Sequence, residues 1–142
     1  MKRILVALDG SERAPVVLTA AARLAELNGA QLVLFRAIGI PQDVAREVLE
    51  LTDTRLEDVL IRNAHEELTR MATSLPKNLV ENITTEFATP WDGIVRAGRR
   101  FDADLIVLGA HGYGGIDRLL GTTAGKVANH TDRNVFIVRT PL

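Results

Sequence analysis

Short apolar runs alternate along the chain with segments in which apolar residues recur at helical spacing. The runs at residues 4–8, 30–37 and 103–109 are almost continuously apolar, a pattern typical of strands buried on both faces of a sheet. Residues 83–88 instead alternate apolar and polar side chains, which predicts a half-exposed edge strand. Residues 134–139 predict a last strand.

The segments between these strands carry helix signals. After the first strand, Val17, Ala21 and Leu24 lie at helical spacing, and we expect Ser11 to cap this helix and the Asn-Gly pair at 28–29 to end it. Thr89 followed by Pro90 predicts the start of another helix, which runs to about Arg100. Residues 122–131 predict the last helix.

The long connection between the second and third strands is expected to hold two helices. Residues 40–51 predict a short one. Thr54 and Glu57 have the spacing of a capping box, which would open a second, longer helix. The apolar row of that helix consists of Leu56, Leu60, Ala64, Leu68, Met71 and Leu75.

Composition narrows the class of protein. The 142 residues fit one domain, 1–142, and 46% hydrophobic with 25% charged residues is typical of a soluble globular protein. A net charge of −1 gives no basic surface for nucleic acid, and the absence of cysteine excludes disulfides and thiolate chemistry. No apolar run approaches a membrane span, and Asp9 interrupts the short run after Met1, so we expect a cytoplasmic protein.

Five alternations of strand and helix predict an α/β domain with a mainly parallel sheet. Ligands of such sheets bind beyond the carboxyl ends of the strands, where the strand order reverses. The candidate segments at those ends are 9–11, 36–39, 88–91 and the glycine-rich stretch that begins at Gly109.

The glycine-rich stretch has the features of a phosphate site. Gly109 and Gly112 bracket the turn that leaves the fourth strand, and Gly121, Thr122 and Thr123 open the last helix, where free N–H groups and the helix dipole favour an anion. A Walker A loop is excluded, because Leu120 and Val127 stand where its glycine and its Ser or Thr belong. A dinucleotide fingerprint is excluded as well, because the cluster follows the fourth strand rather than the first.

A third spacing fits better. Gly109, two residues, Gly112, an eight-residue spacer and Gly121-Thr122 resemble the nucleotide loop of the universal stress protein family. The segments "ILVALDGSE", "ADLIVLGAHG", "LLGTTAGKV" and "NVFIVR" also resemble that family, in its order and across the whole chain. ATP-binding members typically have nine residues between the second and third glycines, one more than this chain has.

The resemblance implies a three-layer α/β/α sandwich of the adenine nucleotide alpha hydrolase-like type, with a five-stranded parallel sheet in the order 3-2-1-4-5. It also implies a homodimer formed through residues 134–139. The implied cofactor is ATP, with Mg²⁺ or Mn²⁺ as its candidate metal. The residues at matching positions are Asp9 at the ribose, Ala37 at the adenine, Leu108 and Gly109 flanking the ribose and phosphates, and Gly112, Gly121, Thr122 and Thr123 at the phosphates. His111 is a candidate phosphate donor.

Alternatives remain open at this point. Asp9 is equally suited to capping its own turn, and a loop histidine such as His111 is commonly solvated. The leading hypothesis is an ATP-binding stress-response protein whose nucleotide state alters its choice of an unknown protein partner. The others are a nucleotide-independent dimeric interaction module and a slow ATPase or phosphoryl-transfer enzyme, for which the chain offers Asp9, His111 and Asp117 but no P-loop lysine.

Overall fold

The structure is a computed structural model that describes residues 1–39, 46–110 and 121–140, with the backbone alone at 46–55. The described residues form nine elements in strict strand–helix alternation. They are β1 (Arg3–Ala7), α1 (Ala14–Asn28), β2 (Gln31–Ile38), α2 (Arg46–Ala72), β3 (Val80–Phe87), α3 (Pro90–Arg100), β4 (Leu105–Gly109), α4 (Thr122–His130) and β5 (Asn134–Val138).

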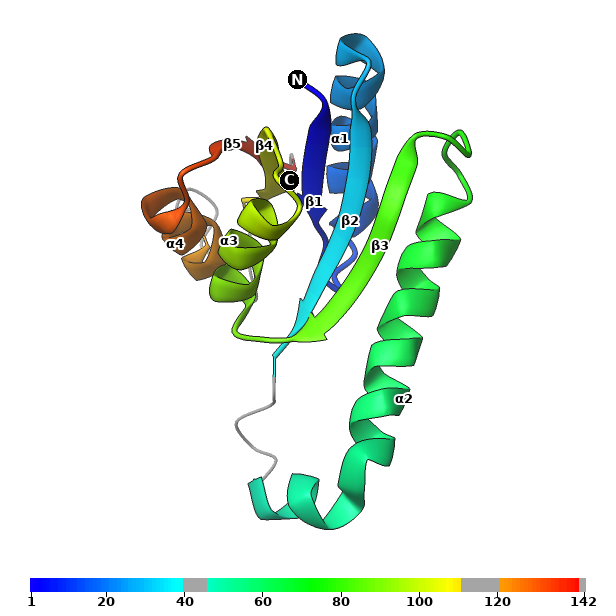
Figure 1. Ribbon diagram of the computed structural model, residues 1–142, viewed down its shortest axis with the longest axis vertical. Coiled ribbons are helices and arrows are strands. Elements are labelled where there is room, and N and C mark those ends of the chain that lie inside the picture. Colours follow the sequence, from blue (N-terminus) through cyan, green and yellow to red (C-terminus); the bar gives the residue numbers. More distant parts are fainter. Residues whose placement is uncertain (40–45, 111–120, 141–142) are drawn as a thin grey trace.

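The five strands form one parallel sheet in the order β3-β2-β1-β4-β5. Residues of α1 and α2 pack on one face of this sheet, and residues of α3 and α4 pack on the other. Figure 1 shows β1, β2 and β3 running down through the middle, with α3 and α4 on one side and α1 and α2 on the other. The predicted three-layer fold and strand order are therefore confirmed.

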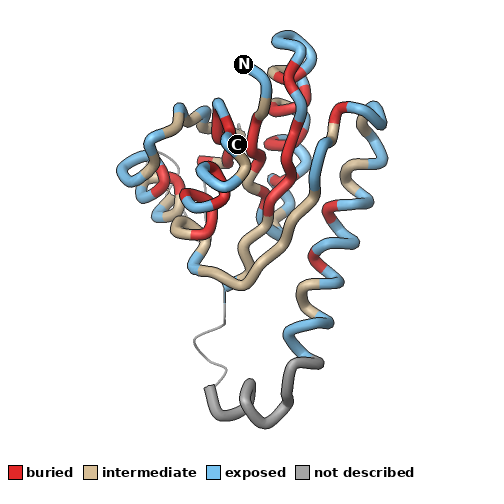
Figure 2. The backbone as a smooth tube through the Cα atoms, in the orientation of Figure 1, coloured by how far each residue is buried: buried red, intermediate tan, exposed pale blue. Residues whose placement is uncertain are grey.

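The central strands are buried on both faces, as their continuous apolar runs predict. Ile4 and Val6 point into the core beneath α1 and α2, whereas Leu5 between them points into the core beneath α3 and α4, and all three are fully buried. Alternation of side chains along a strand explains this division, because successive residues face opposite sides of the sheet. Figure 2 shows the buried residues concentrated in these central strands.

The first helix confirms one predicted boundary and corrects the other. Gly29 ends α1 in the left-handed conformation, with φ 65° and ψ 28°, and its N–H donates to the carbonyl of Ala25. At the other end, however, α1 begins at Ala14 after Arg13, so Ser11 is not its N-cap residue. The Ser11 hydroxyl instead accepts a bond from the Arg13 N–H within the preceding turn, at 3.3 Å.

The prediction of two helices before the third strand is wrong. One continuous helix, α2, runs from Arg46 to Ala72, so Thr54 and Glu57 lie inside it and do not form a capping box at its start. Residues 40–45 of the predicted short helix lie outside the described residues. In Figure 1, α2 lies beside β3 and extends past the carboxyl ends of the strands.

The third strand lies at the edge of the sheet, as predicted, but begins at Val80 rather than at residue 83. Its extra residues pair with β2 across an irregularity between Leu32 and Val33. Glu81 belongs to this extension, and both of its carboxylate oxygens accept bonds from the Arg3 guanidinium at 2.8 Å. This bidentate ion pair holds the start of β3 to β1 on the far side of β2.

Candidate functional site

The carboxyl edge of the sheet brings together two segments that are far apart in the sequence. β1 and β4 are direct neighbours, with Leu5 opposite Ile106, so the turn after β1 and the segment after β4 leave the same edge side by side. The helices that follow pack on opposite faces, α1 on one and α4 on the other. Such a divergence creates a crevice at the switch point of an open α/β sheet. Asp9, Gly109 and the start of α4 all lie at this edge.

The β1–α1 turn is organised by the Asp9 side chain. Its Oδ1 accepts a bond from the Ser11 N–H at 3.0 Å, which is an Asx-turn. Asp9 is exposed, and an ionised carboxylate accepts several bonds, so the turn does not exhaust its acceptor capacity. The structure thus places Asp9 in a turn-forming role that leaves it accessible to a ligand.

A short hydrogen bond closes the base of the glycine-rich loop. The Gly121 N–H donates to the carbonyl of Ala110 at 2.7 Å, and the Ala110 N–H donates to the carbonyl of Val138 at 2.9 Å. The Gly121 amide, one of the predicted phosphate donors, is therefore already occupied within the chain. Two other predicted residues, His111 and Gly112, lie outside the described residues.

The first turn of α4 supplies the donors that Gly121 does not. The Gly125 N–H donates to the Gly121 carbonyl and is the first intrahelical donor, so the preceding amides of Thr122, Thr123 and Ala124 have no partner within the helix. Thr122 is exposed and Thr123 is half-buried, so both hydroxyls lie at or near the surface. The positive end of the helix dipole adds to the attraction for an anion.

Three predicted residues offer backbone rather than side chains to the edge. Leu108 is 3% exposed, and its side chain belongs to the core beneath α3 and α4. A Cβ added at Gly109 would lie 3.3 Å from Cγ2 of Val17, so close packing of α1 already accounts for a glycine there. Ala37 is half-buried at the end of β2 and packs against the same core as Leu108.

Arg36 is a charged residue at this edge that lies in the candidate segment 36–39 but received no role from the sequence. Its Nη1 donates to Oε2 of Glu67 on α2 at 2.6 Å, and a Cβ added at Gly10 would lie 2.7 Å from its Nη2. The signal in the sequence was an arginine interrupting the apolar run at 30–37. Among the described residues, no group of three or more His, Cys, Asp or Glu side chains could hold a metal ion.

Charged groups at the amino edge of the sheet are structural. Asp104 accepts bonds from the N–H groups of Lys2 and Arg3 at 2.6 and 2.9 Å, and these bonds lower the pKa of its carboxyl. The hydrogen bond from Arg3 likewise lowers the pKa of Glu81. Both acids are thus held ionised where they fasten β1 to its neighbours.

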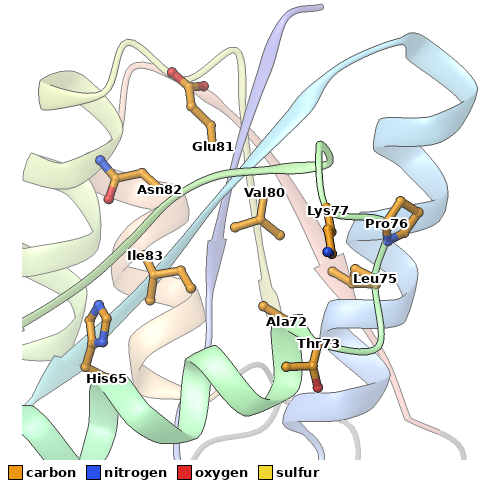
Figure 3. Close-up of a pocket in the computed structure, with 10 residues that line it drawn as sticks. All are labelled: His65, Ala72, Thr73, Leu75, Pro76, Lys77, Val80, Glu81, Asn82 and Ile83. Carbon is orange, nitrogen blue, oxygen red and sulfur yellow. The ribbon is translucent and has the colours of Figure 1, made fainter.

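A groove of about 560 Å³ lies between α2 and β3, away from the carboxyl edge. Figure 3 shows Leu75 and Lys77 at one end and His65 at the other, with Val80 and Ile83 of β3 along its wall. The groove therefore lies at the start of β3 and shares no residue with the candidate site.

Comparison with known proteins agrees with this geometry. The five-stranded parallel sheet with helices on both faces defines an open α/β fold. The model of the universal stress protein family matches residues 1–139, and the chain belongs to this family. No helix in the described part of the chain is long and apolar enough to cross a membrane.

Individual relatives span nearly the whole chain. Universal stress protein A homolog 1 of Coxiella burnetii is 29% identical, over 96% of this chain and 95% of its own length. The structure of UspA from Lactobacillus plantarum is 25% identical with a TM-score of 0.80, and the match covers 97% of both chains. The universal stress protein of Archaeoglobus fulgidus, solved in complex with dAMP, is 24% identical with a TM-score of 0.67, over 96% of this chain and 97% of its own.

Proposed function

We propose that this protein binds ATP at the carboxyl edge of its sheet and acts as a cytoplasmic, homodimeric stress-response regulator. The observation that carries the proposal is the convergence of the Asp9 turn and the α4 N-terminus at the β1–β4 switch point. The dAMP bound by the Archaeoglobus fulgidus relative supports an adenine nucleotide as the ligand.

The described residues suit the parts of such a ligand. The exposed Asp9 carboxylate is an acceptor for ribose hydroxyls, and the amides of Thr122 and Thr123 are donors for phosphate oxygens. When bound, the nucleotide would supply the negative charge that the α4 dipole favours. Because the Gly121 amide bonds Ala110, the phosphates would rest on the first turn of α4 rather than on Gly121.

Titration calorimetry with an Asp9→Asn variant tests this proposal. Asparagine keeps an oxygen for the Ser11 N–H, so the turn survives, but it removes the charge that strengthens a bond to ribose hydroxyls. We expect ATP affinity to fall about tenfold, which corresponds to roughly 1.4 kcal/mol, with the melting temperature unchanged.

Asp104→Asn is the matched control, because Asp104 also accepts backbone N–H bonds but lies at the amino edge. It should leave ATP affinity unaltered. Titrations with and without Mg²⁺ or Mn²⁺ test the metal requirement. Absence of any heat at millimolar ATP in the wild type would refute nucleotide binding and favour the nucleotide-independent module.

The homodimer is supported by the far edge of the sheet. β5 is an edge strand, and the Phe136 side chain on it is 43% exposed. An edge strand with an exposed aromatic residue is suited to pairing with a second copy. Sedimentation analysis of the wild type should therefore give twice the mass of one chain.

A further inference from the structure

Arg36 connects two elements that are otherwise separate at the carboxyl edge. The strand residues before it, from Leu32 to Phe35, are fully buried, but the Arg36 side chain is 21% exposed and reaches Glu67 on α2. On its other side the guanidinium lies against Gly10 in the turn after β1. One cation thus contacts both the helix and the turn that carries Asp9.

The contact with Gly10 is tight. A Cβ at this position would lie 2.7 Å from Nη2 and 3.4 Å from Cζ of Arg36, closer than real Cβ atoms approach, so any side chain at residue 10 displaces the guanidinium. The bond to Glu67 is charge-assisted, at 2.6 Å, and Arg36 is partly shielded from water. Such bonds are stronger than those between neutral groups.

Among the described residues, the hydrogen bonds of the turn are mostly local. Asp9 bonds Ser11, Ser11 bonds Arg13, and these contacts are local. The Leu8 N–H donates to the carbonyl of Phe35 and joins the end of β1 to β2 at 2.9 Å. Beyond Leu8, the guanidinium of Arg36 lies between this turn and Glu67 of α2.

We propose that Arg36 is a positioning residue that couples the Asp9 turn to α2. A nucleotide that draws Asp9 towards its ribose moves Gly10 against or away from the guanidinium, and the bond to Glu67 carries that movement to the helix. Coupling of this kind is reciprocal: if the nucleotide changes the affinity of α2 for a partner by some factor, that partner changes the affinity for the nucleotide by the same factor. The inference rests on the proposed nucleotide function and adds a route by which the bound state reaches another surface.

A set of variants distinguishes coupling of the Asp9 turn to α2 from a purely structural role of the Arg36–Glu67 bond. Glu67→Gln removes the charge from the bond, whereas Glu66→Gln removes the same charge from the neighbouring exposed residue of α2. Gly10→Ala pushes the guanidinium aside without removing it. We expect Glu67→Gln and Gly10→Ala each to weaken ATP binding about fivefold by calorimetry, at the lower end of typical allosteric couplings. Glu66→Gln should leave it unchanged.

Arg36→Met tests whether these effects share one route. In this background Gly10→Ala should add nothing, because the group it displaces is absent. Hydrogen exchange of residues 56–72 gives a second readout, since ATP should slow exchange in the wild type and in Glu66→Gln but not in Arg36→Met. Arg36→Lys should restore part of the ATP effect, because lysine keeps the charge but not the planar fork.

The possible outcomes distinguish failure of nucleotide binding from failure of the coupling through Arg36. If the wild type binds no ATP, both the proposed function and the coupling are refuted. If it binds ATP but Glu67→Gln behaves as Glu66→Gln and α2 exchange is unaffected, the coupling fails and nucleotide binding stands. If Arg36→Met alone loses binding, Arg36 contacts the ligand directly and the coupling is refuted. If Arg36→Met does not fold, a cycle between Gly10→Ala and Glu67→Gln applies, and purely additive effects would overturn the coupling.

Discussion

Gly109 offers a test of why a glycine ends β4. A Cβ added there would lie 3.3 Å from Cγ2 of Val17, whereas carbon atoms pack best at about 3.5–4.0 Å. Val17 is buried and its β-branched side chain has one strongly preferred rotamer in a helix, so its methyl group gives way only against packed neighbours. The steric cost of Gly109→Ala, about 1–2 kcal/mol, exceeds the roughly 0.4–1 kcal/mol that alanine gains by restricting the unfolded chain.

We therefore expect Gly109→Ala to lower the free energy of unfolding by about 1 kcal/mol and the melting temperature by about 3–4 °C. Thermal and urea melts followed by circular dichroism measure both quantities. Gly125→Ala in α4 is the matched control, because a Cβ at Gly125 meets nothing within 4 Å and should stabilise the helix. In a Val17→Ala background the cost of Gly109→Ala should vanish.

An equal cost in both backgrounds would refute the packing explanation. A second refuting result is that Gly109→Ala loses ATP affinity while its melting temperature is unchanged. Residue 109 would then be glycine because the ligand approaches its backbone closely. The experiment therefore distinguishes two reasons for one residue that the sequence alone presents as equivalent.

Three further predictions concern the core, the sheet edges and pH. Leu68→Ala should cost about 3 kcal/mol in urea melts, because Leu68 is 1% exposed and holds α2 to the sheet. Phe136→Glu should give a monomer by sedimentation, with retention of the dimer contradicting the proposed interface. Since the Arg3 guanidinium lowers the pKa of Glu81, the ion pair stabilises the fold above the ordinary value of 4.5, and this stability is lost as the pH falls below it. Glu81→Gln should reduce the loss of unfolding free energy at acid pH by less than 1 kcal/mol, because both side chains of the pair are a third exposed. An unchanged pH profile of stability would contradict this.

The central strands of the sheet could be predicted from the sequence, because strands buried on both faces are apolar at every position. Ile4 to Val6 and Leu32 to Phe35 are apolar at every position, and strands with this pattern lie inside a parallel sheet. The strand order came from the family resemblance rather than from the pattern itself, since apolar runs do not specify their neighbours.

The errors arose where polar residues have more than one structural use. Thr54 and Glu57 have capping-box spacing, but the same three-residue spacing occurs on the surface of a continuous helix, which is where α2 places them. The start of β3 was missed because Glu81 and Asn82 are poor strand signals, and only the distant partner Arg3 explains the charge. The role of Arg36 was not predicted for the same reason, although the segment 36–39 was a candidate, because that role depends on Gly10 and Glu67.

The bond between the Ala110 carbonyl and the Gly121 amide also bears on how loop length can vary in this chain. Because it fixes the two ends of the intervening segment to each other, residues could be added or removed between them without shifting the strand before or the helix after. The segment can then be exchanged for a longer version from a relative while the sheet stays as it is.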